Sequence, residues 1–143
     1  MNIESPFTYR MDIKVRWQEL DALNHVNNAT YFTYFEDVRI QYMRYLGYDS
    51  LNSHTGFGPI LATVSCDFKS PVAFPDTLSV GCGVTRLGNS SLNLDYDIYS
   101  NQQNKMVTYG KSVVVMVNYK TGKPVPIPPE VRTKIKEINV TDS

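Results

Sequence analysis

Apolar residues between Asn28 and Leu46 recur every three or four positions, and this stretch contains no Gly or Pro. The stripe consists of Tyr31, Phe35, Val38, Tyr42 and Tyr45, widened by Phe32, Tyr34 and Met43. This spacing predicts an amphipathic helix that Asn27 or Asn28 caps and that Gly47 ends in a left-handed turn. Because so many of its positions are bulky and apolar, we expect the helix to be enclosed on most sides.

Period-two alternation of apolar and polar residues predicts five strands in the rest of the chain. The predicted strands cover residues 7–16, 59–70, 77–87, 92–99 and 107–119. Residues 113–117 are apolar on both faces, which predicts that the last strand lies in the middle of a sheet or at an interface between two sheets. Pro129 begins a short terminal helix with Val131, Ile135 and Ile138 on one face. The pattern therefore predicts an α+β fold in which an antiparallel sheet encloses the long helix.

Small residues mark one face of the strand predicted over residues 77–87: Ser79, Gly81, Gly83 and Thr85. Such a face favours close packing against another backbone, and the central helix is the candidate. Within that helix, Glu36 and Asp37 precede Arg39 and Arg44, the order that the helix dipole prefers.

Composition narrows the possible functions. At 143 residues we expect one domain over residues 1–143, and 14 basic residues balance 14 acidic ones, so nucleic acid and anionic membranes are not expected partners. The N-terminus lacks the basic and apolar regions of a signal peptide, and no apolar run is long enough to span a membrane. Cys66 and Cys82 lie in predicted strands without a CxxC motif. Together these features predict a cytoplasmic protein with reduced cysteines.

A dense polar cluster precedes the helix and consists of Glu19, Asp21, Asn24, His25, Asn27 and Asn28. A carboxylate and an imidazole four residues apart, beside the free N–H groups of a helix N-terminus, are the parts of a hydrolytic site. Asp21 can activate water or attack a carbonyl carbon directly.

Each of these residues also has a simpler interpretation. Asp21 alone would be a loop carboxylate that caps the helix, and His25 either takes part in the chemistry or orients Asp21. Asn27 and Asn28 are more typical of caps, whose neighbouring N–H groups can still bind an oxyanion. Tyr31 either belongs to the core or lines a pocket for an acyl group.

Two further alternatives involve the histidines. Glu19, Asp21 and His25 could form a carboxylate-rich metal site, but no second histidine stands at a useful spacing, so we expect no metal. His54 lies in a loop rich in Ser, Asn and Gly over residues 49–58, where an exposed histidine is expected more than a catalytic one. The loop is long enough to form part of a substrate entrance.

The motif Asp21-Ala-Leu-Asn-His25-Val-Asn-Asn28-x-x-Tyr31 resembles that of hotdog-fold acyl-CoA thioesterases of the 4-hydroxybenzoyl-CoA thioesterase-like group. The resemblance extends from about Phe7 to Pro126, and the motif is also similar to a segment of plant acyl-carrier-protein thioesterases. In the plant enzymes an asparagine lies between the aspartate and the histidine at the position of Leu23, whereas this chain has Asn24 one place later.

The resemblance implies a five-stranded antiparallel sheet wrapped around one long central helix. It also implies that Asp21 is the nucleophile or general base, and that the backbone amide of Asn28 binds the thioester oxygen. No cofactor is implied beyond the coenzyme A of the substrate, and no metal. The same group is homodimeric or homotetrameric, with sites between subunits, and an exposed sheet edge would suit a two-fold partner.

The function predicted from the sequence is hydrolysis of an acyl-CoA or acyl-carrier-protein thioester to a free acid and a thiol, with the acyl chain along the apolar side of the helix. Candidate substrate contacts are Asn24, Asn27 and Tyr31 near the helix, and Lys69, Arg86, Ser90 and Ser91 for coenzyme A. The last four are equally typical of solvated strand ends. A hotdog dehydratase or isomerase acting on a thioester and a non-catalytic acyl-binding module remain as alternatives.

Overall fold

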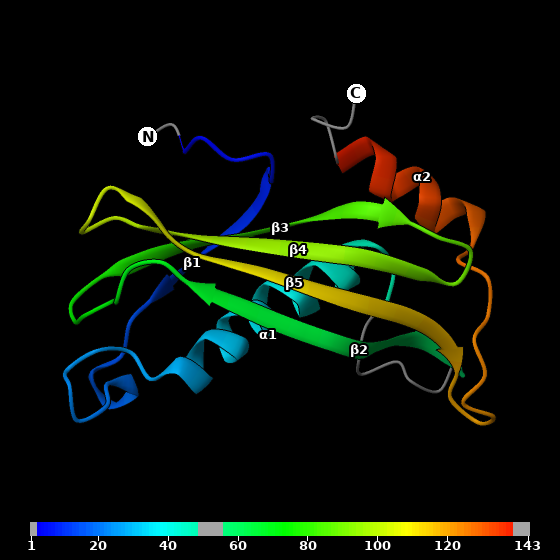
Figure 1. Ribbon diagram of the computed structural model, residues 1–143. Helices are drawn as coiled ribbons and strands as arrows, with labels where there is room; N and C mark the ends of the chain where they lie inside the picture. The colour runs from blue at the N-terminus through cyan, green and yellow to red at the C-terminus, as the bar shows by residue number, and fades with distance from the viewer. Residues whose placement is uncertain (1–2, 49–55, 139–143) are drawn as a thin grey trace.

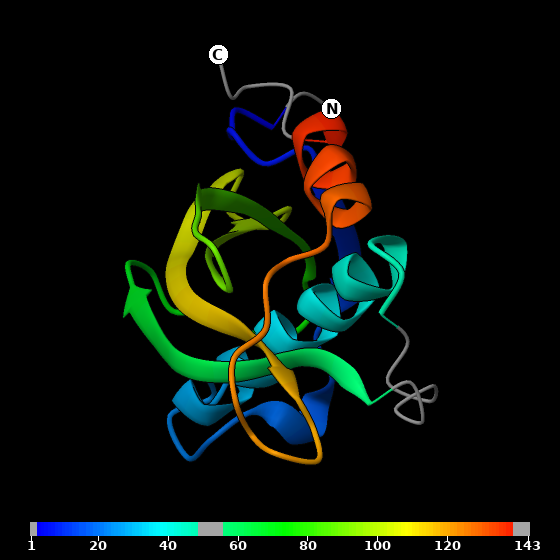
Figure 2. The same cartoon turned by 90° about the vertical axis from the view of Figure 1, so that its right-hand side faces the viewer.

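The computed structural model describes residues 3–48 and 56–138. Its described part contains one antiparallel sheet with the strand order β1-β3-β4-β5-β2. The strands are β1 (Tyr9–Lys14), β2 (Phe57–Phe68), β3 (Thr77–Leu87), β4 (Ser91–Ser100) and β5 (Lys105–Asn118). The sheet curls around α1 (Asn28–Tyr45), and α2 (Pro129–Ile138) lies near the opposite end of the molecule from the start of α1 (Figures 1 and 2). The predicted hotdog architecture is confirmed.

The two ends of α1 follow the predicted capping chemistry. The Asn27 side chain accepts a hydrogen bond of 2.9 Å from the Ala29 amide, so Asn27 is the cap and Asn28 the first helical residue. At the other end Gly47 has a φ of 104°, and the Tyr48 amide donates to the Met43 carbonyl at 2.8 Å. The helix between these caps has 18 residues and is about 27 Å long.

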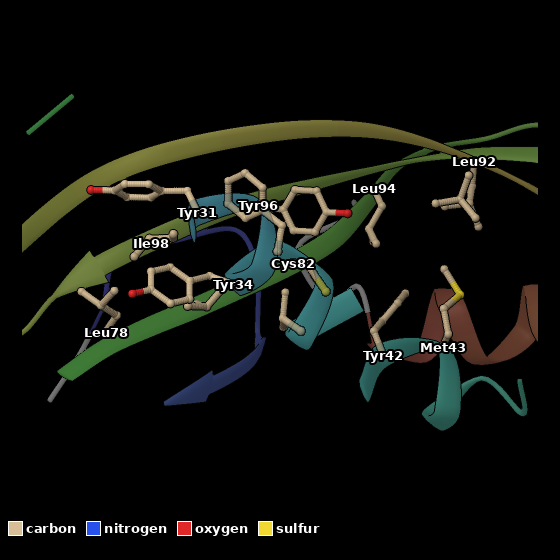
Figure 3. Packing of buried hydrophobic residues seen from close by; sticks show 14 of the residues in the cluster. Tyr31, Tyr34, Tyr42, Met43, Leu78, Cys82, Leu92, Leu94, Tyr96 and Ile98 are labelled. Atoms are coloured by element: carbon tan, nitrogen blue, oxygen red, sulfur yellow. The ribbon is translucent and has the colours of Figure 1, made fainter. Parts of the chain in front are cut away.

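The core lies between α1 and the concave face of the sheet. Tyr31, Tyr34, Phe35, Val38 and Tyr42 of the predicted stripe are all buried, and they pack against β3 and β4 (Figure 3). Each such side chain contributes about 1.5–3 kcal/mol by leaving water. The stripe therefore fixes how α1 is rotated on the sheet, and with it the direction of the segment that precedes the helix.

One expectation about the helix is wrong. Phe32, Ile40 and Tyr45 are 37%, 37% and 42% exposed, so α1 is not enclosed on most sides within one chain. The sheet covers only the face of the helix that carries the buried stripe. Apolar residues on the flanks therefore remain accessible.

The small residues of β3 do not face the helix, which corrects a second expectation. A side chain at Gly81 would come within 2.2 Å of an Arg10 nitrogen and 3.0 Å of an Asp97 oxygen. Arg10 and Asp97 form an ion pair of 2.7 Å on the opposite face of the sheet from α1. Leu78, Val80 and Cys82 belong instead to the hydrophobic core that includes the buried stripe of α1. Gly81 therefore makes room for an ion pair, not for a helix.

Strand β2 is one edge of the sheet, and β5 lies in its interior between β4 and β2, which is the first of the two positions that its apolar faces predicted. Large apolar side chains on β2 are strongly exposed: Phe57, Ile60, Leu61 and Phe68 are 52%, 45%, 40% and 43% accessible. An exposed apolar edge strand is a surface for pairing with another chain. Most of the predicted 49–58 loop, including His54, lies outside the described residues.

Candidate functional site

The polar cluster before α1 forms a tight hairpin. Leu20 and Val26 pair as an isolated bridge, and the Asp21 amide donates to the His25 carbonyl at 2.8 Å. The chain reverses through Asn24, whose φ of 62° is a left-handed conformation that Asn tolerates better than most residues. The exposed side chain of Asn24 thus stands at the turn of this hairpin, and its predicted substrate contact remains a prediction.

Backbone hydrogen bonds fasten this hairpin to two other segments. The Val26 amide donates to the Val72 carbonyl at 2.8 Å, and the Asn27 amide donates to the Glu19 carbonyl at 3.0 Å. The first bond ties the hairpin to the connection between β2 and β3, and the second ties it to the 3-10 turn η1 (Trp17–Glu19). The hairpin is therefore held in position by two other segments of the chain.

Asp21 is half-buried and has one oxygen engaged in the hairpin. Its Oδ1 accepts a hydrogen bond of 2.9 Å from the Leu23 amide and a longer one of 3.4 Å from the His25 amide. Within residues 3–48 and 56–138, Oδ2 has no hydrogen-bond partner. Asp21 therefore does not cap α1, whose cap is Asn27. One oxygen of the Asp21 carboxylate is held by the hairpin, and the other is available to a substrate or a water.

The amide of Asn28 is the first N–H of α1. Within the described part of the chain it donates to no acceptor, whereas the next two amides bond to the side chain and carbonyl of Asn27. An unpaired N–H at the positive end of a helix dipole is a donor suited to a developing oxyanion. Asn27 itself is exposed and acts as the cap.

His25 touches Asp21 through its backbone. Its carbonyl accepts from the Asp21 amide, and its own amide points at Asp21 Oδ1. The half-buried imidazole makes no hydrogen bond to any described residue. The backbone of His25 thus orients Asp21, and a chemical role for its ring stays a prediction.

Tyr31 belongs to the core. It is 2% exposed, and its ring lies 5.0 Å from Phe68 and 5.9 Å from Tyr34, in edge-to-face arrangements. Burial raises the pKa of Tyr31 to about 12, a hydrogen bond with the Val72 backbone opposes this, and the nearby Asp21 carboxylate adds a small further rise. The predicted contact between Tyr31 and an acyl group gains no support from its burial.

A contact that the sequence did not predict connects the helix with the polar cluster. The Tyr34 hydroxyl donates to Glu19 Oε1 at 2.9 Å, and the same oxygen accepts from the Arg16 amide at 2.8 Å. Burial, followed by the Glu19 hydrogen bond, raises the pKa of Tyr34. Glu19 is thereby occupied in holding the 3-10 turn against α1.

Among the described residues, no three His, Cys, Asp or Glu side chains gather in a way that could hold a metal ion.

Cys66 lies on β2, close enough to Tyr31 to contribute to the raised pKa of that side chain. Burial, followed by the charge of Asp67, raises the pKa of Cys66 to about 12. At neutral pH the side chain is therefore a thiol and a poor nucleophile.

The four predicted coenzyme A contacts do not lie together in one chain. Lys69 follows β2 directly, at the end of the sheet near Tyr31 and Phe68. Ser91 is in register with Val115, which pairs with Ile60, so Ser90, Ser91 and the exposed Arg86 lie toward the other end of the sheet (Figure 1). Eight residues of strand between Ile60 and Phe68 correspond to about 26 Å. Within one chain, only Lys69 shares the end of the sheet that holds Asp21.

An open hollow of about 330 Å³ lies between the ends of β1 and β3 and the β4–β5 turn. Its lining includes Lys14, Phe74, Asp76 and Gln102, and none of the predicted site residues.

The helices of the described segments include none that is long and apolar enough to cross a membrane.

Comparison with known proteins places this geometry in context. The family model of the thioesterase-like superfamily matches residues 15–135. The uncharacterized protein YsmA of Bacillus subtilis is 33% identical over 122 residues, covering 85% of this chain and 81% of that protein. The long-chain acyl-CoA thioesterase FadM of Escherichia coli is 24% identical over 134 residues, covering 88% of this chain and 96% of FadM.

A solved structure of similar shape contains a ligand. The crystal structure of a thioesterase from Thermus thermophilus, complexed with coenzyme A and Zn, superposes with a TM-score of 0.82. The two chains are 29% identical, and the match covers 96% of this chain and 97% of that one.

Proposed function

The chain belongs to the thioesterase-like superfamily and is a thioesterase, and from this premise we propose that it hydrolyses acyl-CoA thioesters with Asp21 as the catalytic carboxylate. The observation that carries the proposal is Asp21 Oδ2, which accepts no hydrogen bond from any described residue while the hairpin before α1 holds Oδ1 of the same carboxylate. The names of FadM and of the coenzyme A complex support a coenzyme A thioester as the substrate. No cofactor is proposed beyond the coenzyme A that the substrate carries.

In the general-base form of the reaction, Asp21 Oδ2 takes a proton from a water molecule while the water oxygen attacks the thioester carbon. The negative charge that develops on the carbonyl oxygen is bound by the Asn28 N–H at the positive end of α1. The tetrahedral intermediate then collapses, the C–S bond breaks, and the proton on Asp21 passes to the departing thiolate. The products are a free acid and coenzyme A.

In the nucleophilic form, Asp21 Oδ2 attacks the thioester carbon and the thiolate leaves with its electron pair. The resulting mixed anhydride is opened by water, which restores the carboxylate and releases the acid, and the proton set free in this step passes to the thiolate. Both forms use the same oxygen and the same oxyanion donor. His25 sits beside Asp21 and is the candidate for moving a proton in either form.

The functional unit in this proposal is a homodimer or homotetramer. Strand β2 is an edge strand of the described sheet and carries exposed Ile60, Leu61 and Phe68, and antiparallel pairing of two β2 strands would continue the sheet. Such pairing sets the Ile60 end of one β2 beside the Phe68 end of the other. It therefore brings Arg86, Ser90 and Ser91 of the second chain toward the Asp21 end of the first, where they could bind coenzyme A together with Lys69.

Release of free thiol from a panel of acyl-CoA and acyl-carrier-protein thioesters tests this function. We expect stoichiometric thiol and free acid from at least one class of acyl-CoA. A dehydratase or isomerase would instead consume the substrate with the thioester bond intact, and that result would contradict hydrolysis.

A further inference from the structure

Arg39 brings a positive charge from α1 into the space between the helix and the sheet. Its Nη1 donates a hydrogen bond of 3.0 Å to the hydroxyl of Tyr96, a β4 side chain that is 1% exposed. Arg39 is the twelfth of 18 helical residues, too far from the C-terminus for the dipole role that its sequence position suggested. The arginine therefore needs another explanation.

The hydrogen-bond chain behind Arg39 has a single consistent direction. Ser112 Oγ lies 2.8 Å from the Tyr96 hydroxyl and donates to the Leu94 carbonyl at 2.7 Å. Because the only Ser112 proton is used there, Tyr96 must donate to Ser112, and the Tyr96 oxygen is left to accept from Arg39. In Figure 3 the Tyr96 hydroxyl points toward Leu94, opposite to the hydroxyls of Tyr31 and Tyr34. The chain thus fixes one corner of the guanidinium and supplies no negative charge.

Among the described residues, Arg39 has no carboxylate partner. The ion pair in this part of the chain joins Arg10 and Asp97 on the other face of the sheet. A half-buried charge without a counter-ion is costly. The positive charge of Arg39 acts on the core: burial raises the pKa of Tyr96, and the Arg39 charge opposes this rise. With Nη1 turned to Tyr96, the Nε–Nη2 edge of the guanidinium remains, and that edge suits bidentate binding of a carboxylate.

Arg39 lies on the same flank of α1 as the proposed oxyanion donor. Asn28, Phe32 and Arg39 are spaced by four and seven residues, so they follow one line along the helix. The eleven residues between the ends of this line correspond to about 16 Å. An arginine side chain leans toward the helix N-terminus, which leaves a gap of roughly 10 Å. The side chain between them is Phe32, which is apolar and 37% exposed.

We propose that Arg39 binds a carboxylate at the far end of the acyl group, so that this thioesterase acts on coenzyme A monothioesters of dicarboxylic acids. The inference rests on the proposed function and deepens it. The thioester carbonyl lies at the Asn28 amide, the methylene chain follows the flank past Phe32, and the terminal carboxylate takes the free edge of the guanidinium. Tyr96 and Ser112 are positioning residues, because they act only through Arg39.

The test compares pairs of substrates of equal length. The kcat/KM values of adipoyl-, suberoyl- and sebacoyl-CoA are measured beside those of hexanoyl-, octanoyl- and decanoyl-CoA. Succinyl-CoA is too short for the gap and serves as an internal control. We expect the wild type to prefer the carboxylate member of the longer pairs, and Arg39→Gln to lower that preference at least about ten-fold, the usual effect of losing a hydrogen bond to a charged group.

Three further variants make the result specific. Lys111→Gln removes the same charge from an exposed side chain next to Ser112, and we expect it to leave the preference unchanged. Arg39→Lys should retain part of the preference, because it keeps the charge and loses the bidentate edge. Tyr96→Phe should raise KM for the dicarboxylic substrates more than it lowers kcat. Melting temperatures of all variants show whether each one is folded.

The possible outcomes separate this inference from the function on which it rests. Hydrolysis of neutral acyl-CoAs with no wild-type preference for a terminal carboxylate, or a preference that survives Arg39→Gln, overturns the role of Arg39 and leaves the thioesterase proposal standing. No thiol release from any acyl-CoA overturns the proposed function itself. If Arg39→Gln fails to fold, the wild-type preference and its response to Arg39→Lys decide the matter.

Discussion

The hydroxyl of Tyr34 donates a hydrogen bond of 2.9 Å to the Glu19 carboxylate and so joins the buried face of α1 to the segment that precedes it. Because the Glu19 carbonyl also accepts from the Asn27 amide, this contact holds the N-terminus of the helix in place. We expect Tyr34→Phe to lower the free energy of unfolding by about 1 kcal/mol. Urea denaturation measures this, with Tyr109→Phe on the exposed face of β5 as the control. Equal losses in the two variants would contradict a special role for Tyr34.

Gly110 leaves room for the aromatic packing beneath α1. A methyl group there would lie 2.5 Å from two carbon atoms of Phe35, whose ring stacks on Tyr96 at 4.5 Å. We expect Gly110→Ala to destabilise the protein by about 1–3 kcal/mol through overpacking. The double variant with Phe35→Leu should lose less than the sum of the two single changes, since the smaller side chain makes space. Additive losses would show that the methyl group and the ring do not compete.

The half-buried carboxyl of Asp37 makes the stability of the folded protein depend on pH. Burial, and then the charges of Glu36 and Glu19, raise its pKa above the ordinary value of 3.8. A carboxyl whose pKa is raised by folding favours the folded state below its unfolded pKa, and that contribution is lost as the pH rises through the folded pKa. Asp37→Asn should therefore raise the melting temperature at pH 7 and have little effect below about pH 3.8. The control is Asp12→Asn on β1. An Asp37→Asn protein that is less stable at pH 7 would refute the argument.

The edge strand β2 should determine the oligomeric state. Leu61 is 40% exposed on this strand, and a charge there should prevent two copies from pairing. We expect Leu61→Lys to shift the mass measured by light scattering to that of a monomer and to lower thiol release at least ten-fold, because the coenzyme A contacts would be separated. Ile40→Lys, a similar change on the exposed flank of α1, is the comparison. A monomeric wild type with full activity would contradict the proposed assembly.

Much of the fold could be predicted because local pattern and tertiary structure agree. The stripe from Tyr31 to Tyr42 is buried, Asn27 and Gly47 act at the helix ends, and the strand predicted over residues 77–87 has the observed bounds. Periodicity tells which residues share a face, but not which partner that face meets. For this reason the small residues of β3 were predicted to pack against the helix, whereas Gly81 makes room for Arg10 and Asp97.

The candidate site shows the same limit. Asp21 and His25 are close in sequence, and the hairpin joins their backbones as a local motif can indicate. The Tyr34–Glu19 contact depends on the path of the chain between residues 19 and 34, and Arg39 meets Tyr96 only because α1 rests on β4. Arg86, Ser90 and Ser91 lie away from Asp21 because the sheet register separates them, which no local motif reveals.

The most direct test of the whole account is thiol release by Asp21→Asn. Asparagine keeps an oxygen that can accept from the Leu23 amide, so the hairpin and the melting temperature should be preserved. It has no carboxylate to act as base or nucleophile, and we expect kcat for the best acyl-CoA to fall by about 10²–10⁴-fold. Wild-type kcat in the folded Asp21→Asn protein would contradict the central claim.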